Sequence, residues 1–312
     1  MRIPATSFLV TLAFLGLGAS ATAAGWHSEA NIPTAVADPA AGEVNGIVYF
    51  AGGNSSGGPT SALQAYDPTK NSWTTLASLP ETLYQGSGAA DINSQLYVTG
   101  GWNGPLPTNT LYVYDPPSNS WSQKAAVPHL SACGLSGVIN TKLYVITPCD
   151  GFSGVRQDLD MYDPASNSWT SLADSLAEHS QPAGCVINSK LYVAGGATDS
   201  GVTNVTEVYD PASNSWSQLA NMPTAGFGMA SVALDGKLYA FGGTDGSGNV
   251  LSIVQVFDPV KNRWKKLGIG MPGPTTGAGA ALAYGIAFVA GGGNGSSYLG
   301  STNGLFVNPS VP

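Results

Sequence analysis

Short runs of β-forming apolar residues, separated by pairs of turn-forming residues, recur along almost the whole chain. In one of them, Cys185-Val186-Ile187 is followed by Asn188-Ser189 and then by Lys190-Leu191-Tyr192-Val193. Two such arms around a two-residue turn predict a β-hairpin, because Asn, Asp and Gly accept the positive φ angles that a tight hairpin turn requires. The chain is therefore predicted to be built from short β-strands.

Six hairpins of this kind are predicted, and five of them end in a pair of glycines. The turns are Asn45-Gly46, Asn93-Ser94, Asn140-Thr141, Asn188-Ser189, Asp235-Gly236 and Tyr284-Gly285. The glycine pairs are Gly52-Gly53, Gly100-Gly101, Gly195-Gly196, Gly242-Gly243 and Gly291-Gly292. The missing side chains at these pairs are expected to let neighbouring backbones approach closely.

A second repeated string follows the first five hairpins. It reads aromatic-Asp-Pro-x-x-Asn-x-Trp, and its successive Asp residues are 48, 48, 47 and 48 positions apart. These residues are Asp67, Asp115, Asp163, Asp210 and Asp258. Proline fixes φ, Asp can bond neighbouring backbone N–H groups, and Asn tolerates the left-handed conformation. The string therefore predicts a strand, a turn and another strand.

Each unit thus holds two hairpins, and four short strands in roughly 48 residues are typical of one blade of a β-propeller. The di-glycine, the aromatic residue before Asp-Pro and the spaced Trp resemble the kelch repeat over nearly all of the chain after residue 24. The resemblance implies an all-β fold, a six-bladed β-propeller of four-stranded kelch-type blades. In the third unit Thr147-Pro148 replaces the di-glycine, so the local backbone there is expected to differ.

The two ends of the repeat are predicted to complete one blade together. The sixth unit ends at Phe306-Val307-Asn308-Pro309 and lacks a Trp strand of its own. Trp26 lies 47 residues before Trp73, and the interval from Trp26 to Pro33 matches that from Trp73 to Pro80. We therefore expect the N-terminal segment to be the outer strand of the sixth blade. This strand closes the ring and removes the free sheet edges of an open array.

Residues 1–24 have the pattern of a secretory signal peptide, which leaves residues 25–312 for the propeller. Arg2 gives a positive start, Ser7 to Gly18 supply an apolar stretch, and Ala21-Thr22-Ala23 fits the cleavage pattern. The alternative is an uncleaved membrane anchor, for which the apolar run is short, because a spanning helix needs about 20 residues. We expect a secreted or periplasmic protein.

The charge of the chain argues against two classes of partner. Asp and Glu number 19 against 11 Lys and Arg, which gives a formal net charge of −8 and an isoelectric point near 4.6. Nucleic acids and anionic membranes are bound mainly through Lys and Arg. Neither is expected as a partner, and the protein is expected to be a monomer.

Three cysteines remain in a chain that is predicted to enter an oxidising compartment, where one disulfide and one free thiol is the simplest arrangement. Across the hairpin that turns at Asn140-Thr141, Cys133 and Cys149 stand within one position of being direct partners. A disulfide between them is therefore predicted, with Cys185 as a buried free thiol. No cofactor and no metal is expected, because the His and Cys residues form no recognisable ligand pattern.

Function is expected where the blades differ, in the loops after the second and fourth strands, which share one face of a propeller. We call this side the loop face. The candidate ligand-binding residues after second strands are Trp102, Phe152 and Arg156, and those after fourth strands are Tyr84, His129, Glu178 and His179. No catalytic residue is assigned.

Two of these candidates have a specific structural alternative. Arg156 could clamp a carboxylate ligand in a bidentate manner, or it could be a solvated loop arginine or a partner for Asp158 or Asp160. Trp102 could be a stacking platform for a sugar, or a lid that packs on its own loop. These alternatives distinguish a binding role from a scaffold role at each position.

The function predicted from this reasoning is an exported binding module that recognises a carbohydrate or a protein through the loop face. The alternative is a sugar-modifying enzyme, because kelch propellers include a periplasmic sialic acid mutarotase and sugar-oxidising copper enzymes. A mutarotase needs an acid/base group and a carboxylate-binding arginine, which Glu178, His179 and Arg156 could supply. Adjacent residues of an extended segment point opposite ways, however, which disfavours Glu178 and His179 as a pair. The copper ligand set is not visible, and the signal peptide opposes an intracellular adaptor.

Overall fold

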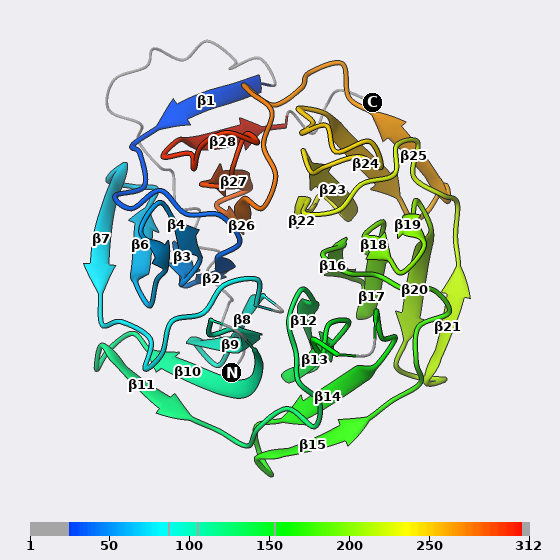
Figure 1. Ribbon diagram of the computed structural model, residues 1–312, viewed down its shortest axis with the longest axis horizontal. Helices are drawn as coiled ribbons and strands as arrows, with labels where there is room; N and C mark the ends of the chain where they lie inside the picture. Colours follow the sequence, from blue (N-terminus) through cyan, green and yellow to red (C-terminus); the bar gives the residue numbers. More distant parts are fainter. Residues whose placement is uncertain (1–24, 87, 105, 153, 308–312) are drawn as a thin grey trace, which may run out of the picture.

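The computed structural model describes residues 25–86, 88–104, 106–152 and 154–307, and the predicted signal peptide lies outside them. Six four-stranded antiparallel sheets stand around a central channel as the blades of a propeller (Figure 1). Every regular element in the described residues is a β-strand. The predicted fold class is therefore confirmed.

Each blade runs from an inner strand beside the channel to an outer strand at the rim. Blade 1 holds β2(Ala40–Val44), β3(Ile47–Ala51), β6(Leu63–Asp67) and β7(Ser72–Leu76), and blade 2 holds β8(Ala89–Ile92), β9(Gln95–Trp102), β10(Pro107–Asp115) and β11(Ser120–Gln123). Blade 3 holds β12(Leu135–Ile139), β13(Lys142–Ile146), β14(Leu159–Asp163) and β15(Ser168–Ser171). Blade 4 holds β16(Ala183–Ile187), β17(Lys190–Ala194), β20(Thr206–Asp210) and β21(Ser215–Gln218), and blade 5 holds β22(Ala230–Leu234), β23(Lys237–Phe241), β24(Val254–Asp258) and β25(Arg263–Lys266).

Blade 6 joins the two ends of the described chain. It holds β26(Gly279–Ala283), β27(Ile286–Ala290) and β28(Thr302–Phe306), and its outer strand is β1(Gly25–Glu29). Strand β1 pairs antiparallel with β28 from Gly25 opposite Phe306 to Glu29 opposite Thr302. The predicted closure of the ring by an N-terminal outer strand is confirmed.

The repeated Asn and Trp of the sequence string form a clamp between neighbouring blades. In five blades the Trp indole N–H donates to the carbonyl of an alanine in the preceding loop, at 2.7–3.0 Å. The Asn side-chain oxygen of the same blade accepts the N–H of that alanine, also at 2.7–3.0 Å. Each Asn has a φ angle between 44° and 50°, a conformation that Asn tolerates better than most residues. The alanines are Ala30, Ala77, Ala125, Ala173 and Ala220.

The di-glycines are required by the close approach of neighbouring loops. A Cβ atom on Gly100 would lie 2.0 Å from the carbonyl oxygen of Ser131, and one on Gly52 would lie 2.2 Å from that of Leu83. Blade 3 departs from this arrangement as expected. Thr147 and Pro148 are not among the residues with positive φ, and Pro148 has no N–H to give to the next loop.

One residue of each blade contributes to a closed ring of backbone hydrogen bonds, which we call the neck of the channel. The N–H of each donates to the carbonyl of the neck residue in the preceding blade, at 2.6–3.0 Å, and every φ lies between 50° and 64°. The six residues are Asp38, Gln85, Cys133, Gln181, Gly228 and Gly277. The neck fixes the distance between the six blades at the base of the loop face.

Candidate binding face

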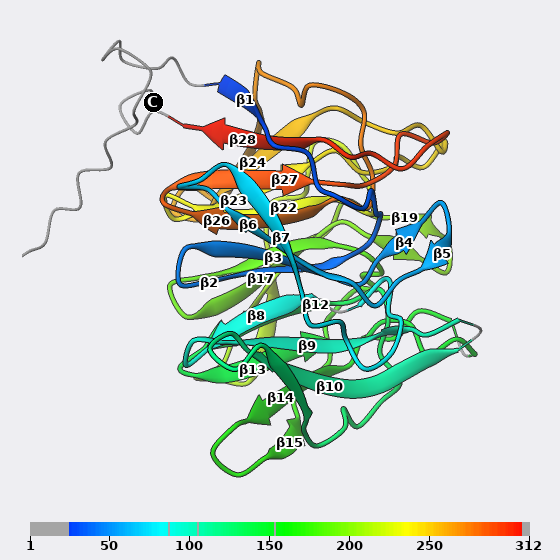
Figure 2. The ribbon, with the colours of Figure 1, turned by 90° about the vertical axis from the view of Figure 1, so that its left-hand side faces the viewer.

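The loops that follow the second and fourth strands share one side of the propeller. In each blade a short β-bridge joins them, as between Ala37 and Asn54 or between Tyr84 and Trp102. The small hairpins β4(Asn54–Ser55)–β5(Gly58–Pro59) and β18(Ala197–Thr198)–β19(Gly201–Val202) lie on this side, and β4, β5 and β19 project from it at the right of Figure 2. The loop face of the sequence analysis is therefore a contiguous surface around the channel entrance.

Most of the net negative charge of the described chain belongs to the loop face. Its loops carry eight acidic residues, Asp38, Glu81, Asp150, Asp158, Asp174, Glu178, Asp199 and Asp245, against two basic ones, Lys124 and Arg156. The opposite face and the rim carry nine acids, Glu29, Glu43, Asp67, Asp91, Asp115, Asp163, Asp210, Asp235 and Asp258. They also carry eight bases, Lys70, Lys142, Lys190, Lys237, Lys261, Arg263, Lys265 and Lys266. Such an asymmetry attracts positively charged partners to the loop face.

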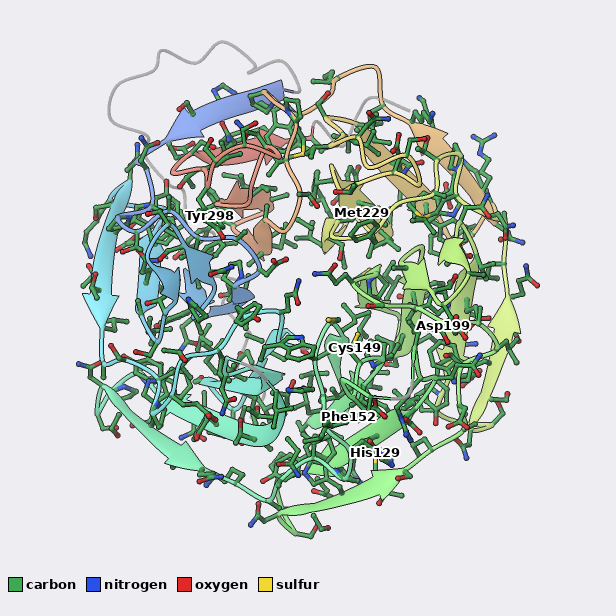
Figure 3. All side chains as sticks on the ribbon, in the orientation of Figure 1. His129, Cys149, Phe152, Asp199, Met229 and Tyr298 are labelled. Carbon is green, nitrogen blue, oxygen red and sulfur yellow. The ribbon has the colours of Figure 1, made fainter. Side chains whose placement is uncertain are left out.

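Blades 2 and 3 present exposed apolar side chains in these loops. Phe152 is 74% exposed and Leu106 is 49% exposed. Figure 3 shows Phe152 in the sector of blade 3, between Cys149 and His129. The corresponding loop of blade 5, residues 244–249, contains only Thr, Asp, Gly, Ser and Asn. An exposed aromatic ring contributes more to binding than to folding when it leaves this much of its surface in water.

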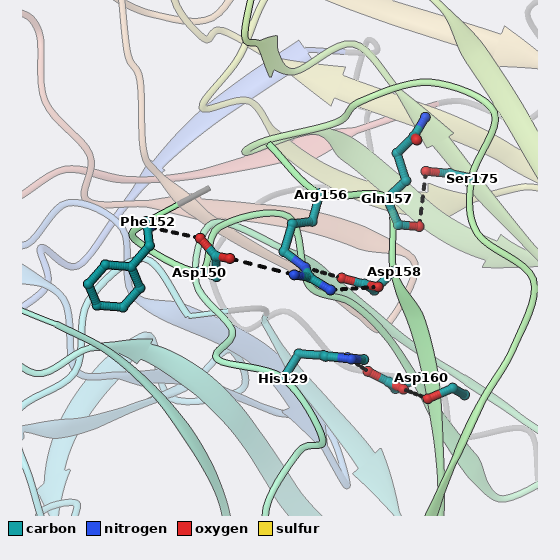
Figure 4. Close-up of polar contacts among 9 residues, drawn as sticks. His129, Asp150, Phe152, Arg156, Gln157, Asp158, Asp160 and Ser175 are labelled. Carbon is teal, nitrogen blue, oxygen red and sulfur yellow. Dashed lines mark hydrogen bonds and ion pairs between the residues drawn. The ribbon is translucent and has the colours of Figure 1, made fainter. Parts of the chain in front are cut away.

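Arg156 is held by two carboxylates of its own blade (Figure 4). Its Nε donates to Asp158, its Nη2 lies 3.1 Å from Asp158 Oδ1, and its Nη1 lies 3.6 Å from Asp150 Oδ2. The hydrogen bond to Asp158 raises the pKa of Arg156, and the charge of Asp150 acts in the same direction. Of the two alternatives for this residue, the structure forms the ion pair with Asp158.

Trp102 and Tyr84 stand beside each other at the channel entrance. Each backbone N–H donates to the carbonyl of the other, at 2.8 Å and 3.1 Å. The indole of Trp102 is half-buried, and a Cβ on Gly151 of the next blade would lie 3.4 Å from it. Trp102 therefore packs under the loop of blade 3, whereas a part of its surface remains open to a ligand.

His129 is bound to a scaffold position. Its Nδ1 lies 3.0 Å from Asp160 Oδ2, and Asp160 is fully buried and also accepts a 2.7 Å bond from the Ser171 hydroxyl (Figure 4). In blade 1 the equivalent buried side chain, Gln64, bonds instead the backbone N–H and carbonyl of Thr34, in the loop that precedes that blade. The His129–Asp160 pair therefore anchors the loop that precedes blade 3.

Glu178 and His179 point in opposite directions, as their extended segment predicts. His179 is 1% exposed, its Nδ1 lies 2.7 Å from the Gly195 carbonyl, and its Nε2 lies 3.4 Å from Glu207 Oε2. Glu178 instead accepts the N–H of Asp199 at 2.9 Å near the surface. Asp199 in turn accepts the Val155 N–H at 2.9 Å, so Glu178 helps to order the loops of blades 3 and 4.

The thiols of Cys133 and Cys149 are in contact but carry no covalent bond in the structure. A hydrogen bond from Cys133 lowers the pKa of Cys149, and the same bond together with burial raises the pKa of Cys133. Cys149 also lies 3.1 Å from the hydroxyl of Ser180. Cys185 is buried, as predicted, and this burial raises the pKa of its thiol. The predicted disulfide therefore stays a prediction, with its two sulfur atoms already adjacent.

Sequence reasoning missed the side chains of the neck. Asp38 and Gln181 each precede a proline and lie 143 positions apart, at the equivalent place of blades 1 and 4. Asp38-Pro39 does not lie at the repeat distance from the other Asp-Pro pairs. This difference is the feature of the sequence that could have indicated a separate role for Asp38. Within the described ranges no three His, Cys, Asp or Glu side chains are grouped so as to hold a metal ion. In the same part of the chain no helix is long and apolar enough to cross a membrane.

Comparisons with known proteins agree with this architecture. A KLHDC2/KLHL20/DRC7 Kelch-repeats domain matches residues 138–307, and the Kelch motif matches residues 35–80 and 85–127. No curated protein matches the chain as a relative. A solved structure described as "Structure of YjhT" is similar to this chain, with a TM-score of 0.77 and 18% sequence identity. The superposition covers 90% of this chain and 97% of the chain in that structure. The chain belongs to the family of kelch-repeat β-propellers.

Proposed function

We propose that the protein is an exported binding module whose loop face recognises a protein or a carbohydrate ligand. The uneven loop face carries this proposal: of its four exposed large apolar side chains in the described residues, Leu106, Phe152 and Leu176 belong to blades 2 and 3 and only Ile269 lies elsewhere, within a surface that holds eight acids and two bases. Export rests on the signal-like pattern of residues 1–24.

Of the two ligand classes, the charge favours a protein with a basic segment. An acidic surface accelerates association with a cationic partner and repels an anionic one. Acidic sugars would meet eight carboxyl groups and one arginine that is already paired with Asp158 and Asp150. A neutral sugar could stack on Phe152 or Trp102 but would gain nothing from the charge.

The sugar-modifying alternative lacks the free groups that it needs. His179 is buried against Glu207, and Arg156 is engaged by two carboxylates. Glu178 remains near the surface, where it accepts the backbone N–H of Asp199 and, among the described residues, has no histidine or arginine side chain bonded to it to act with. Sugar modification would first require that a glycan binds, which the glycan array measures.

The test is a parallel screen of the protein from residue 25 against a peptide array graded in net charge and a glycan array. We expect basic peptides to bind, to bind more weakly as salt is raised, and to bind at least tenfold more weakly to Phe152→Ser. Val260→Ser is the matched control, because Val260 is 91% exposed in a turn of the opposite face. Two results would contradict the choice of a basic protein partner. One is an equal loss of peptide binding in Phe152→Ser and Val260→Ser, and the other is binding to glycans alone that disappears in Arg156→Ala.

A further inference from the structure

The neck of the channel encloses a small polar cavity. It has a volume of about 90 Å³ and is lined by the six neck residues and by the residue that follows each of them. It opens into the wider channel of about 410 Å³ between the inner strands. A cavity of this size has room for more than one water molecule, so it can hold a small polar group.

The neck does not need the side chains that four of its residues carry. All six positions have φ angles of 50–64°, and blades 5 and 6 place glycine there, as Gly228 and Gly277. Non-glycine residues pay roughly 1–2 kcal/mol in this conformation. Blades 1 to 4 nevertheless carry Asp38, Gln85, Cys133 and Gln181, which favours a role for these side chains beyond closing the ring.

The two glutamine side chains converge on the carboxylate of Asp38. Gln85 bonds it, and Gln181 Nε2 lies 3.4 Å from Asp38 Oδ1. A Cβ on Gly277 would lie 2.5 Å from the same oxygen, so the carboxylate occupies the space that this glycine leaves. Burial raises the pKa of Asp38 to about 6, so the group is ionised at neutral pH even though protein surrounds it.

The chemistry of the neck is that of a hydrogen-bond acceptor with one negative charge. The backbone N–H groups of the ring are all used within the ring, and Gln181 directs its amide N–H to Asp38. The oxygens that face a ligand are those of the carboxylate and of the two amides, each with two lone pairs, of which Gln85 Oε1 also accepts a long bond of 3.7 Å from the Cys133 thiol. No Lys, Arg or His lines the neck or the wider channel in the described part of the chain. Besides Asp38, the titratable groups along this path are Cys133 in the neck and Glu43, Asp91 and Cys185 farther along the channel.

We propose that the neck binds a primary ammonium group, which donates hydrogen bonds to Asp38, Gln85 and Gln181. A single positive charge balances a single buried carboxylate that is bonded by amide groups but faces no cationic side chain in the described lining of the neck. Three or four neck oxygens suit the three donors of an ammonium group, whereas Ca²⁺ requires six to eight oxygen ligands. The inference goes beyond the proposed function, because a protein can bind the loop face with the neck empty.

The ammonium group can come from a small free amine or from a lysine side chain that enters through the loop face. Ethylammonium and Nα-acetyl-lysine amide distinguish these sources in separate titrations, with ethanol as the neutral control. The readout is the NMR shift of the side-chain amide signals of Gln85 and Gln181 in the ¹⁵N-labelled protein. Binding of ethylammonium indicates that the neck accepts a free amine, and binding of the lysine amide alone indicates a side chain held from outside.

Three variants test the assignment. Asp38→Asn keeps the shape and the tolerated φ angle and is expected to abolish the ammonium-induced shifts. Gln181→Gly copies the residue of blades 5 and 6 and is expected to weaken binding several-fold. Asp174→Asn removes the same charge from an exposed position of the loop face and is expected to leave binding unchanged.

The pH supplies an independent check. Below a pKa of about 6, each unit of pH lowers the ionised fraction of Asp38 about tenfold, so binding at pH 5 should be about tenfold weaker than at pH 7.5. The proposal is overturned if neither amine shifts the Gln signals, if Asp38→Asn binds as well as the parent, or if Ca²⁺ binds and the amines do not. Peptide binding at the loop face is measured separately, so the two proposals can fail independently.

Discussion

Replacement of the clamp residue Asn167 by glycine should lower stability far more than its exposed position suggests. Its side-chain oxygen accepts the Ala125 N–H at 3.0 Å and the Tyr162 hydroxyl at 2.7 Å, and thereby joins blade 3 to the preceding loop. Glycine retains the φ of 50° without strain, so the change isolates these two hydrogen bonds. Each contributes about 0.5–1.5 kcal/mol, and we expect a loss of about 1–3 kcal/mol in the free energy of unfolding.

The companion variant and the control separate the clamp from the turn. Asn167→Ala should cost about 1 kcal/mol more than Asn167→Gly, because alanine is strained at this φ. Asn93→Gly is the control, since Asn93 is exposed with a φ of 55° in a hairpin turn, and its change should stay within about 0.5 kcal/mol.

Urea unfolding followed by tryptophan fluorescence measures these differences, provided that the slope of the free energy with urea is the same in all variants. If Asn167→Gly is as stable as Asn93→Gly, the clamp does not hold the blades together. If Asn167→Ala and Asn167→Gly are equally destabilised, the tolerance of positive φ is not what selects asparagine here.

Three further predictions concern the closure, the neck and the cysteines. Deletion of residues 26–33 should lower the melting temperature of the whole domain, and an unchanged melting temperature would show that β1 does not close the ring. Because the pKa of Asp38 is raised from 3.8 to about 6, the folded state binds its proton more tightly, and stability is lost as the pH rises from about 4 through 6. Asp38→Asn should therefore gain stability relative to the parent at pH 7.5, by at most about 3 kcal/mol, and lose that gain at pH 4; a difference that does not vary with pH would refute the burial of this charge. Non-reducing peptide mapping of protein exported to an oxidising compartment should place Cys133 with Cys149 and leave Cys185 free, and a bridge that contains Cys185 would exclude this pairing.

The sequence predicted the scaffold because the scaffold repeats. The string with Asn and Trp recurs every 47–48 residues, and each copy makes the same two contacts to an alanine of the preceding loop. The closing role of β1 could be predicted for the same reason, since Trp26 stands at the repeat distance before Trp73. Because the same contact is made in five blades, the residues that make it recur five times, and a single sequence is enough to reveal them.

The candidate site could be predicted only in its location. The loop face follows from the order of strands in a blade, but the partners of its side chains depend on contacts that occur once. The burial of His179 beside Glu207 and the ion pairs of Arg156 are of this kind. The convergence of Asp38 and Gln181 crosses the channel over a sequence separation of 143 residues, and no local pattern reports it.

The clamp also explains why the closing strand matters to the whole ring. Trp26 occupies the clamp position of blade 6, yet its indole N–H is buried with no hydrogen-bond partner among the residues that the structure describes. The residue two places before it is Ala24, which has no side-chain oxygen to replace Asn. The seam between blades 5 and 6 is therefore held without the clamp, by apolar packing that includes the edge-to-face contact of Trp26 with Phe241 at 5.6 Å between ring centres, and by the backbone hydrogen bond from Gly277 to Gly228 in the neck. A ring with five clamped seams and one unclamped seam should open first at the unclamped one, between blade 5 and the blade that β1 completes.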